Sequence, residues 1–217
     1  MRVEWLYKNN TDRVILFFNG WGMDATAVAH LQAEEDVLSF CDYRSWDFVC
    51  PDLSAYRHCA VVAWSMGVWA ASRIVASLKV LPEISIALNG TTRPVDDRFG
   101  IPVKVYELTE KGMNEKGREK FFSRMFDCSE EKERFARQKP NRLLLEVCEE
   151  LSFIRKESQS HTSDVIWNKC YLSEKDLIFP IENQKNWCRV QEIPVVSLPG
   201  GHYPFYCFNS WREIIEG

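Results

Sequence analysis

CAVVAWSMG, at residues 59–67, joins a strand pattern to a helix pattern through a single serine. The residues before Ser65 are small, β-branched or aromatic, as in a buried strand, and an apolar helical stripe starts at Met66. Ala63 and Gly67 keep the side chains small two positions before and after the serine, as a tight strand-to-helix turn requires. The stretch therefore predicts a nucleophile elbow, with Ser65 at the carboxyl edge of a sheet. Taken alone, it also fits a serine that only caps the helix.

Short β-rich runs alternate with helical patterns along most of the chain, which favours an α/β fold with a mainly parallel central sheet flanked by helices. Helical spacing of apolar residues is visible over residues 25–40 and 66–80. Charged residues crowd into the stretch from about 111 to 160, where we expect a helical lid inserted into a single domain of residues 1–217. The expected strands are Val3–Tyr7, Val14–Asn19, Trp46–Cys50, Cys59–Trp64, Ile84–Asn89, Val103–Leu108, Val165–Tyr171 and Val195–Leu198.

The composition narrows the possible partners of this chain of 217 residues. Its net charge is −4 and no five-residue block of Lys and Arg stands out, which argues against nucleic acid. The start lacks the apolar stretch of a secretory signal, and the longest apolar runs are too short to cross a bilayer. We therefore expect a cytoplasmic protein with no membrane partner. The eight cysteines are spaced too widely for a CxxC pair or a paired zinc knuckle, so no metal site is predicted.

A glycine-rich turn, Asn19-Gly20-Trp21-Gly22, directly follows the strand pattern VILFF. In α/β hydrolases the second donor of the oxyanion hole is expected at this place. Glycines on both sides of Trp21 allow the backbone to turn an N–H toward the site. The alternative is an ordinary glycine-rich turn.

A general base must come from the four histidines. His30 falls within a helical pattern, His58 precedes a strand, and His161 lies in a polar stretch, so each has a structural explanation. His202 lies in the turn Pro199-Gly200-Gly201-His202-Tyr203-Pro204, just past the last expected strand. An α/β hydrolase places its base on such a loop, although an exposed turn histidine would give the same pattern.

An acid that orients the base should follow the penultimate strand. Asp176 fits this position, because it lies in the polar turn after VIWNKCYL. Glu174 is the nearest competitor, and Asp164 comes before the strand, at its wrong end. The resulting chain order of serine, aspartate and histidine is that of α/β hydrolases and differs from the order in chymotrypsin-type and subtilisin-type proteases.

Four motifs together resemble one family over essentially the whole chain. They are NGWG at 19–22, WSMGVWA at 64–70, ALNGT at 87–91 and GGHYPF at 200–205. They look like the motifs of BioG-type pimeloyl-[acyl-carrier protein] methyl ester esterases of biotin synthesis. The chain departs from the general G-x-S-x-G pattern of hydrolases at Ala63, where a small side chain still permits the turn.

The resemblance implies an α/β-hydrolase fold and a role for each matching residue. Ser65 would be the nucleophile, His202 the general base and Asp176 its orienting acid. The backbone N–H groups of Trp21 and Met66 would form the oxyanion hole. The implied substrate is a pimeloyl methyl ester on an acyl-carrier protein, and no metal or organic cofactor is required.

Such a substrate needs an apolar channel and a surface that receives an acidic carrier. Ten Lys and Arg against six Asp and Glu lie between Lys111 and Arg142, an excess that would attract such a partner. Buried aromatics are usually plain core, and charge runs are usually solvated helix faces, so both assignments have simpler alternatives. The candidates for the channel are Trp21, Trp64, Trp69, Phe121, Phe122, Met125 and Phe126. The candidates for docking are Lys116, Arg118, Lys120, Arg124, Arg134, Arg137 and Arg142.

Two other functions fit the same motifs. A thioesterase or a small-ester carboxylesterase would carry the same three residues, because they do not reveal the acyl group. A non-catalytic binding module on the same fold is the second alternative, and the intact set of Ser65, Asp176 and His202 argues against it.

Overall fold

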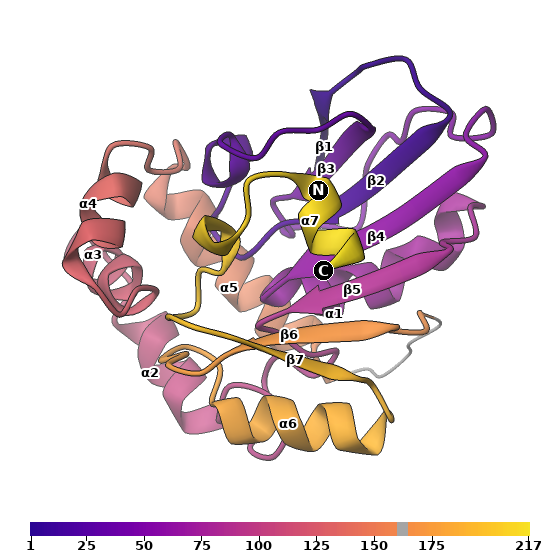
Figure 1. Ribbon diagram of the computed structural model, residues 1–217. Helices are drawn as coiled ribbons and strands as arrows, with labels where there is room; N and C mark the ends of the chain where they lie inside the picture. The colour runs from indigo at the N-terminus through magenta and orange to yellow at the C-terminus, as the bar shows by residue number, and fades with distance from the viewer. Residues whose placement is uncertain (160–164) are drawn as a thin grey trace.

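The computed structural model describes residues 1–159 and 165–217, and within them the strands form one sheet of seven in the order β1-β3-β2-β4-β5-β6-β7 (Figure 1). Only β1 runs antiparallel to its neighbour, β3, and the other pairs are parallel. The expected α/β fold is therefore confirmed. The strands are β1 Arg2–Tyr7, β2 Arg13–Phe18, β3 Asp36–Cys41, β4 His58–Trp64, β5 Ile84–Leu88, β6 Lys169–Ser173 and β7 Val195–Leu198.

Helices cover both faces of the sheet (Figure 1). Two apolar cores lie between the layers. Alternate residues of one strand belong to different cores, as a pleated strand requires: Leu16 of β2 lies in the core that includes α1, whereas Phe17 packs against Trp211 of α7. The helices are α1 Met66–Ile74, α2 Val103–Lys111, α3 Glu115–Arg124, α4 Ser129–Ala136, α5 Leu144–Glu157, α6 Ile181–Val190 and α7 Trp211–Glu216, with short 3-10 turns η1 Ala25–Val28, η2 Val75–Leu78 and η3 Phe205–Cys207.

Helices α2 to α5 lie between β5 and β6 and form the segment that we call the insertion, residues 103–157. They gather on one side of the sheet in Figure 1. The insertion begins earlier than the predicted start near residue 111, because Val103–Leu108 is helical and not a strand. Tyr106 alone in α2 is buried, and its neighbours Val103, Val105 and Leu108 stay exposed. A single buried residue in the whole helix suits a helix that lies on the surface.

The helix predicted over residues 25–40 is wrong. Its first part is the 3-10 turn η1, and its last part, DVLSFC, is the strand β3, in which all six residues are buried. A short apolar run with both faces buried carries no period that separates strand from helix.

The strand predicted at Trp46–Cys50 is a loop, whose Trp46 and Phe48 pack against the edge of the core. The strand predicted from Val165 begins only at Lys169. His161 and Asp164 lie outside the described residues. Among the residues that are described, no helix combines the length and the apolar character needed to cross a membrane.

Candidate functional site

The turn between β4 and α1 holds Ser65 in a backbone conformation that non-glycine residues rarely adopt, with φ 58° and ψ −124°. Its N–H donates to the carbonyl of Leu88 on the next strand at 2.9 Å. The surrounding backbone approaches so closely that a Cβ on Gly67 would lie 2.1 Å from Phe18 O, and one on Gly90 would lie 2.2 Å from Ser65 O. The two glycines therefore create the space in which the serine projects from the carboxyl edge of the sheet.

The structure joins Ser65, His202 and Asp176 in one hydrogen-bonded chain, although they lie far apart in the sequence. Ser65 Oγ is 2.9 Å from His202 Nε2, and His202 Nδ1 is 2.8 Å from Asp176 Oδ2. Because the carboxylate accepts the Nδ1 proton, Nε2 is left free to accept the proton of the serine hydroxyl. All three residues are buried. This arrangement can remove a proton from Ser65 and return it to a leaving group.

Four hydrogen bonds fix the carboxylate of Asp176 in the turn after β6. Its Oδ1 accepts from the N–H groups of Ile178 and Phe179, at 2.8 and 2.9 Å. Its Oδ2 accepts from Gln184 Nε2 of α6 at 3.0 Å as well as from the histidine. The competing Glu174 points elsewhere, because its Oε1 accepts from Ser197 Oγ.

The loop that carries His202 is fixed through its main chain. The His202 carbonyl accepts from Trp64 Nε1 at 3.0 Å and from Asn89 Nδ2 at 2.9 Å. The ring of Phe179 lies parallel to the imidazole, with centroids 5.9 Å apart and planes 7° apart. The imidazole is thus held from both its backbone and its ring face.

Two backbone N–H groups are available beside the serine. Met66 is the first residue of α1, so its N–H has no partner within the helix. The Trp21 N–H lies in the turn after β2, in which the carbonyl of Gly20 accepts from Met23 N. Within residues 1–159 and 165–217 neither N–H donates to another protein group, and such free donors suit a developing oxyanion.

A pocket of about 490 Å³, counted with its open mouth, lies over Ser65. Trp21 and Met66 form part of its wall, and the insertion supplies most of the remainder. A second hollow shares Val105, Thr109, Phe121 and Arg124 with the first and extends toward Met113 and Lys120. The side chains that the insertion contributes to the first pocket are Val105, Tyr106, Thr109, Phe121, Arg124 and Leu151.

Of the side chains predicted to line the channel, only Trp21 and Phe121 do so, and their rings meet edge to face at 4.7 Å. The prediction is wrong for Trp64, because alternation along β4 turns it to the opposite face of the sheet from Ala63. It is also wrong for the residues that belong to the apolar cores and not to the pocket beside Ser65. These are Trp69, Phe122, Met125 and Phe126.

The predicted docking residues divide by exposure. Arg142 is buried, with 1% of its side chain exposed, and pairs with Asp42 at 3.0 Å and Glu150 at 3.3 Å. Its assignment to an exposed docking surface is therefore wrong. Arg118 is half-buried and bonds Glu115 and the carbonyl of Arg142. The remaining candidates are exposed on the insertion: Lys116, Lys120, Arg124, Arg134 and Arg137.

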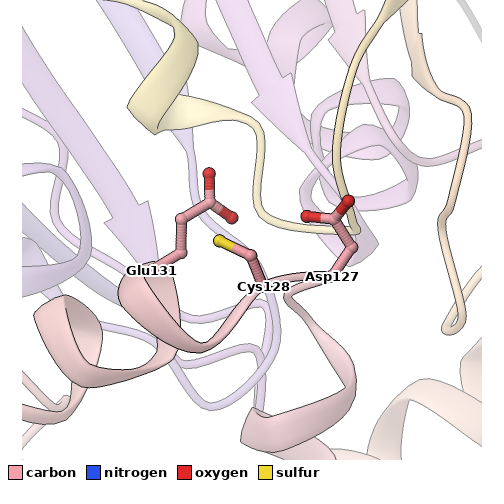
Figure 2. Close-up of side chains that lie close together, drawn as sticks. All are labelled: Asp127, Cys128 and Glu131. Atoms are coloured by element: carbon pink, nitrogen blue, oxygen red, sulfur yellow. The ribbon is translucent and has the colours of Figure 1, made fainter.

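One cluster among the described residues has the donor atoms of a metal site. Asp127 and Cys128 lie in the turn between α3 and α4 and Glu131 lies in the first turn of α4, with their ligand atoms within 4.8 Å of one another (Figure 2). Asp127 and Cys128 are exposed, and Asp127 Oδ2 accepts from Lys175 Nζ at 2.9 Å. Exposed acidic groups are common without an ion, and we assign no metal to this cluster.

Sequence reasoning missed three buried polar residues that shape the site: Asn89, Gln184 and Glu150. Asn89 has φ 46° directly after β5, and its position before Gly90 in ALNGT is the signal that points to a special turn. Gln184 and Glu150 lie within helical patterns, where only their contacts to Asp176 and to the turn at Gly22 set them apart.

The sequence matches the family model of the pimeloyl-ACP methyl esterase BioG over residues 1–214. The chain belongs to the BioG family. The crystal structure of BioG from Haemophilus influenzae resembles it with a TM-score of 0.91 and 32% identity, and the match covers all of both chains. A curated Haemophilus influenzae protein named only as uncharacterized is 36% identical over 220 residues, which cover 96% of each chain.

Of two further matches, one is to part of a longer protein and the other concerns the fold alone. A malonyl-[acyl-carrier protein] O-methyltransferase of Bacteroides fragilis is 40% identical over 191 residues, and the chain spans only 39% of its length. A putative aryl esterase from Burkholderia cenocepacia has a TM-score of 0.64 at 13% identity, covering 94% of this chain and 87% of the other. At that identity the likeness concerns the fold alone.

We expect Gly67→Ala to lower the free energy of unfolding by about 2 kcal/mol or more, because the new Cβ would overlap the Phe18 carbonyl and push α1 off β2. Urea unfolding followed by circular dichroism measures the change. Gly112→Ala is the matched control, since the nearest atom to its Cβ outside the adjacent residues would be Leu108 O at 3.1 Å, a contact that a shift of a few tenths of an ångström relieves. Equal stability of the two variants would contradict the close approach at the elbow.

Proposed function

We propose that this protein hydrolyses the methyl ester of a pimeloyl chain carried on an acyl-carrier protein, giving the free carboxylate and methanol. One observation carries the proposal: the hydrogen-bonded chain from Ser65 through His202 to Asp176 opens into an apolar pocket in a member of the BioG family. The ester carbonyl would lie against Ser65 Oγ, with its oxygen toward the N–H groups of Trp21 and Met66.

In the first half of the reaction, Ser65 Oγ attacks the ester carbonyl while His202 Nε2 takes the hydroxyl proton. The tetrahedral oxyanion accepts hydrogen bonds from the two backbone N–H groups. Asp176 stabilises the imidazolium through Nδ1. The C–O bond to the methoxy group then breaks, and His202 returns the proton so that methanol leaves.

In the second half, water attacks the acyl-enzyme while His202 again accepts a proton. The second tetrahedral intermediate breaks down with protonation of Ser65 Oγ, which releases the acid and restores the enzyme. The family model of BioG supports the pimeloyl substrate. The Bacteroides fragilis relative is named for methyl transfer, but the chain corresponds to 39% of it, and we do not carry that activity over.

The carrier protein would remain outside while the acyl chain that it carries enters the pocket. The second hollow, which shares Phe121 and Arg124 with the pocket over Ser65, supports an entry route between α2 and α3. Exposed cations on the insertion support docking of an acidic partner beside that route, since complementary charge speeds encounter and fixes register.

We expect Ser65→Ala to fold normally. Its rate of methanol release from the carrier-bound pimeloyl methyl ester should fall by about three orders of magnitude or more, because the covalent route is lost. Methanol release and fluorophosphonate labelling measure the effect. Rapid labelling of the unaltered protein at Ser65 distinguishes an esterase from a binding module. Comparison with free small esters and with a carrier-bound thioester distinguishes it from the other serine hydrolases. Activity near that of the unaltered protein would exclude Ser65 as nucleophile.

Asp176→Asn should lower kcat about a thousandfold or more and preserve the fold, because an amide no longer favours the His202 tautomer with a proton on Nδ1. Glu174→Gln is the matched control, two residues away in the same turn, with its carboxylate turned to Ser197. Steady-state kinetics on a small ester measures both variants. A damaging Glu174→Gln with a mild Asp176→Asn would transfer the acid's role to Glu174.

Reversing the charges of Lys116, Lys120 and Arg137 together should impair hydrolysis of the carrier-bound ester and spare a small free ester, since exposed charges act on encounter. Added salt should likewise slow only the carrier-linked reaction at subsaturating substrate. The control variant reverses Arg13, Arg57 and Lys79, which are exposed at the opposite edge of the sheet. Equal losses on both substrates, or none on either, would refute docking on the insertion.

A further inference from the structure

The insertion contributes a buried carboxylate that reaches the turn of the oxyanion hole. Glu150 of α5 is fully buried, and its Oε2 accepts from the N–H of Gly22 at 3.2 Å. Its Oε1 accepts from the N–H of Tyr43, in the turn after β3, at 2.9 Å. One carboxylate therefore ties together two loops that follow neighbouring strands of the sheet.

Three more hydrogen bonds connect the insertion to the same turn. Trp21 Nε1 donates to the carbonyl of Val147 at 2.9 Å. Arg142 Nη1 donates to the carbonyl of Met23 at 3.2 Å, and the N–H of Asn141 donates to Asp24 Oδ2 at 2.7 Å. The turn from Trp21 to Asp24 is thus anchored residue by residue on the segment that closes the pocket.

These bonds determine the direction of the Trp21 N–H. The Gly20 carbonyl points to Met23 N, and because the peptide is planar and trans, the Trp21 N–H of the same unit points the opposite way. Glu150 fixes the orientation of the next peptide, between Trp21 and Gly22, through Gly22 N. A rotation of the Gly20–Trp21 unit would turn the Trp21 N–H away from its present direction, and the fixed neighbouring unit resists that rotation.

The negative charge of the buried Glu150 carboxylate must be stabilised by neighbouring groups. Burial raises the pKa of the Glu150 carboxyl, and Arg142 together with the N–H groups of Tyr43 and Gly22 opposes that rise. Arg142 lies 3.3 Å from Glu150 and is itself buried. An uncompensated negative charge near the site would oppose a developing oxyanion, and the guanidinium offsets that charge.

We propose that Glu150 is a positioning residue, which with Arg142 holds the Trp21 N–H in the orientation that stabilises the oxyanion. This proposal rests on the proposed serine mechanism. It assigns the insertion a role in the chemical step as well as in enclosing the pocket, although neither Glu150 nor Arg142 touches the substrate.

The test uses Glu150→Gln in the full-length protein, with a small aryl ester as substrate and an apolar boronic acid as analogue of the tetrahedral intermediate. We expect kcat to fall about ten- to hundredfold with KM nearly unchanged, and affinity for the boronic acid to fall by a similar factor. Glu150→Asp is the second variant. It keeps the charge that Arg142 needs but withdraws the oxygens from Gly22 N, and should show the same split.

Glu149→Gln is the matched control, because this neighbouring carboxylate is exposed, bonds Arg44 and does not touch the turn. It should leave kcat, KM and boronic-acid affinity unchanged. The proposal is refuted if folded Glu150→Asp or Glu150→Gln keeps the kcat and the analogue affinity of the unaltered protein, or if KM alone rises. Failure of the serine mechanism would appear separately, as unaltered activity of Ser65→Ala on the same ester.

Discussion

The site depends on one close approach of backbone to backbone, where the start of α1 lies against the ends of β2 and β5. Ser65 adopts φ 58° there, and no side chain fits at Gly67 or Gly90. Such a conformation persists only where surrounding structure enforces it. The buried strands on both sides and the apolar face of α1 do so, and the serine is therefore positioned by the sheet and not by a flexible loop.

The sequence predicted the parts of the site that are encoded locally. The turn around Ser65 needs small residues at fixed offsets, and the loop of His202 follows a strand in a glycine-rich segment. Parallel strands carry both to the same edge of the sheet. Asp176 and Glu174 both lie in the turn after a strand, so position in the sequence alone does not decide between them. The structure separates the two through backbone N–H groups and Gln184, which no local pattern reveals.

Features that depend on distant contacts were not predictable from local patterns. The run DVLSFC carries no helical or strand period because both its faces are buried. Trp64 and Phe121 are equally aromatic in the sequence, but only the pleat of β4 and the packing of the insertion decide which reaches the pocket. In the sequence, Arg142 was one of the positive charges between Lys111 and Arg142 that predicted a docking surface. In the structure it is buried, because it pairs with Asp42 and Glu150.

The insertion therefore carries charges of two kinds, and their burial separates their effects. Exposed cations such as Lys120 act over about a Debye length in water and are weakened by salt. Arg142 and Glu150 are both buried and carry opposite charges. They therefore act on the turn at Trp21 through their hydrogen bonds to Gly22 and Met23, more than through a net charge. The proposed recognition of a carrier and the proposed alignment of an oxyanion donor can thus change independently, because they use different parts of the insertion. The exposed cations lie on or beside α3 and α4, whereas Glu150 lies on α5 and Arg142 just before it.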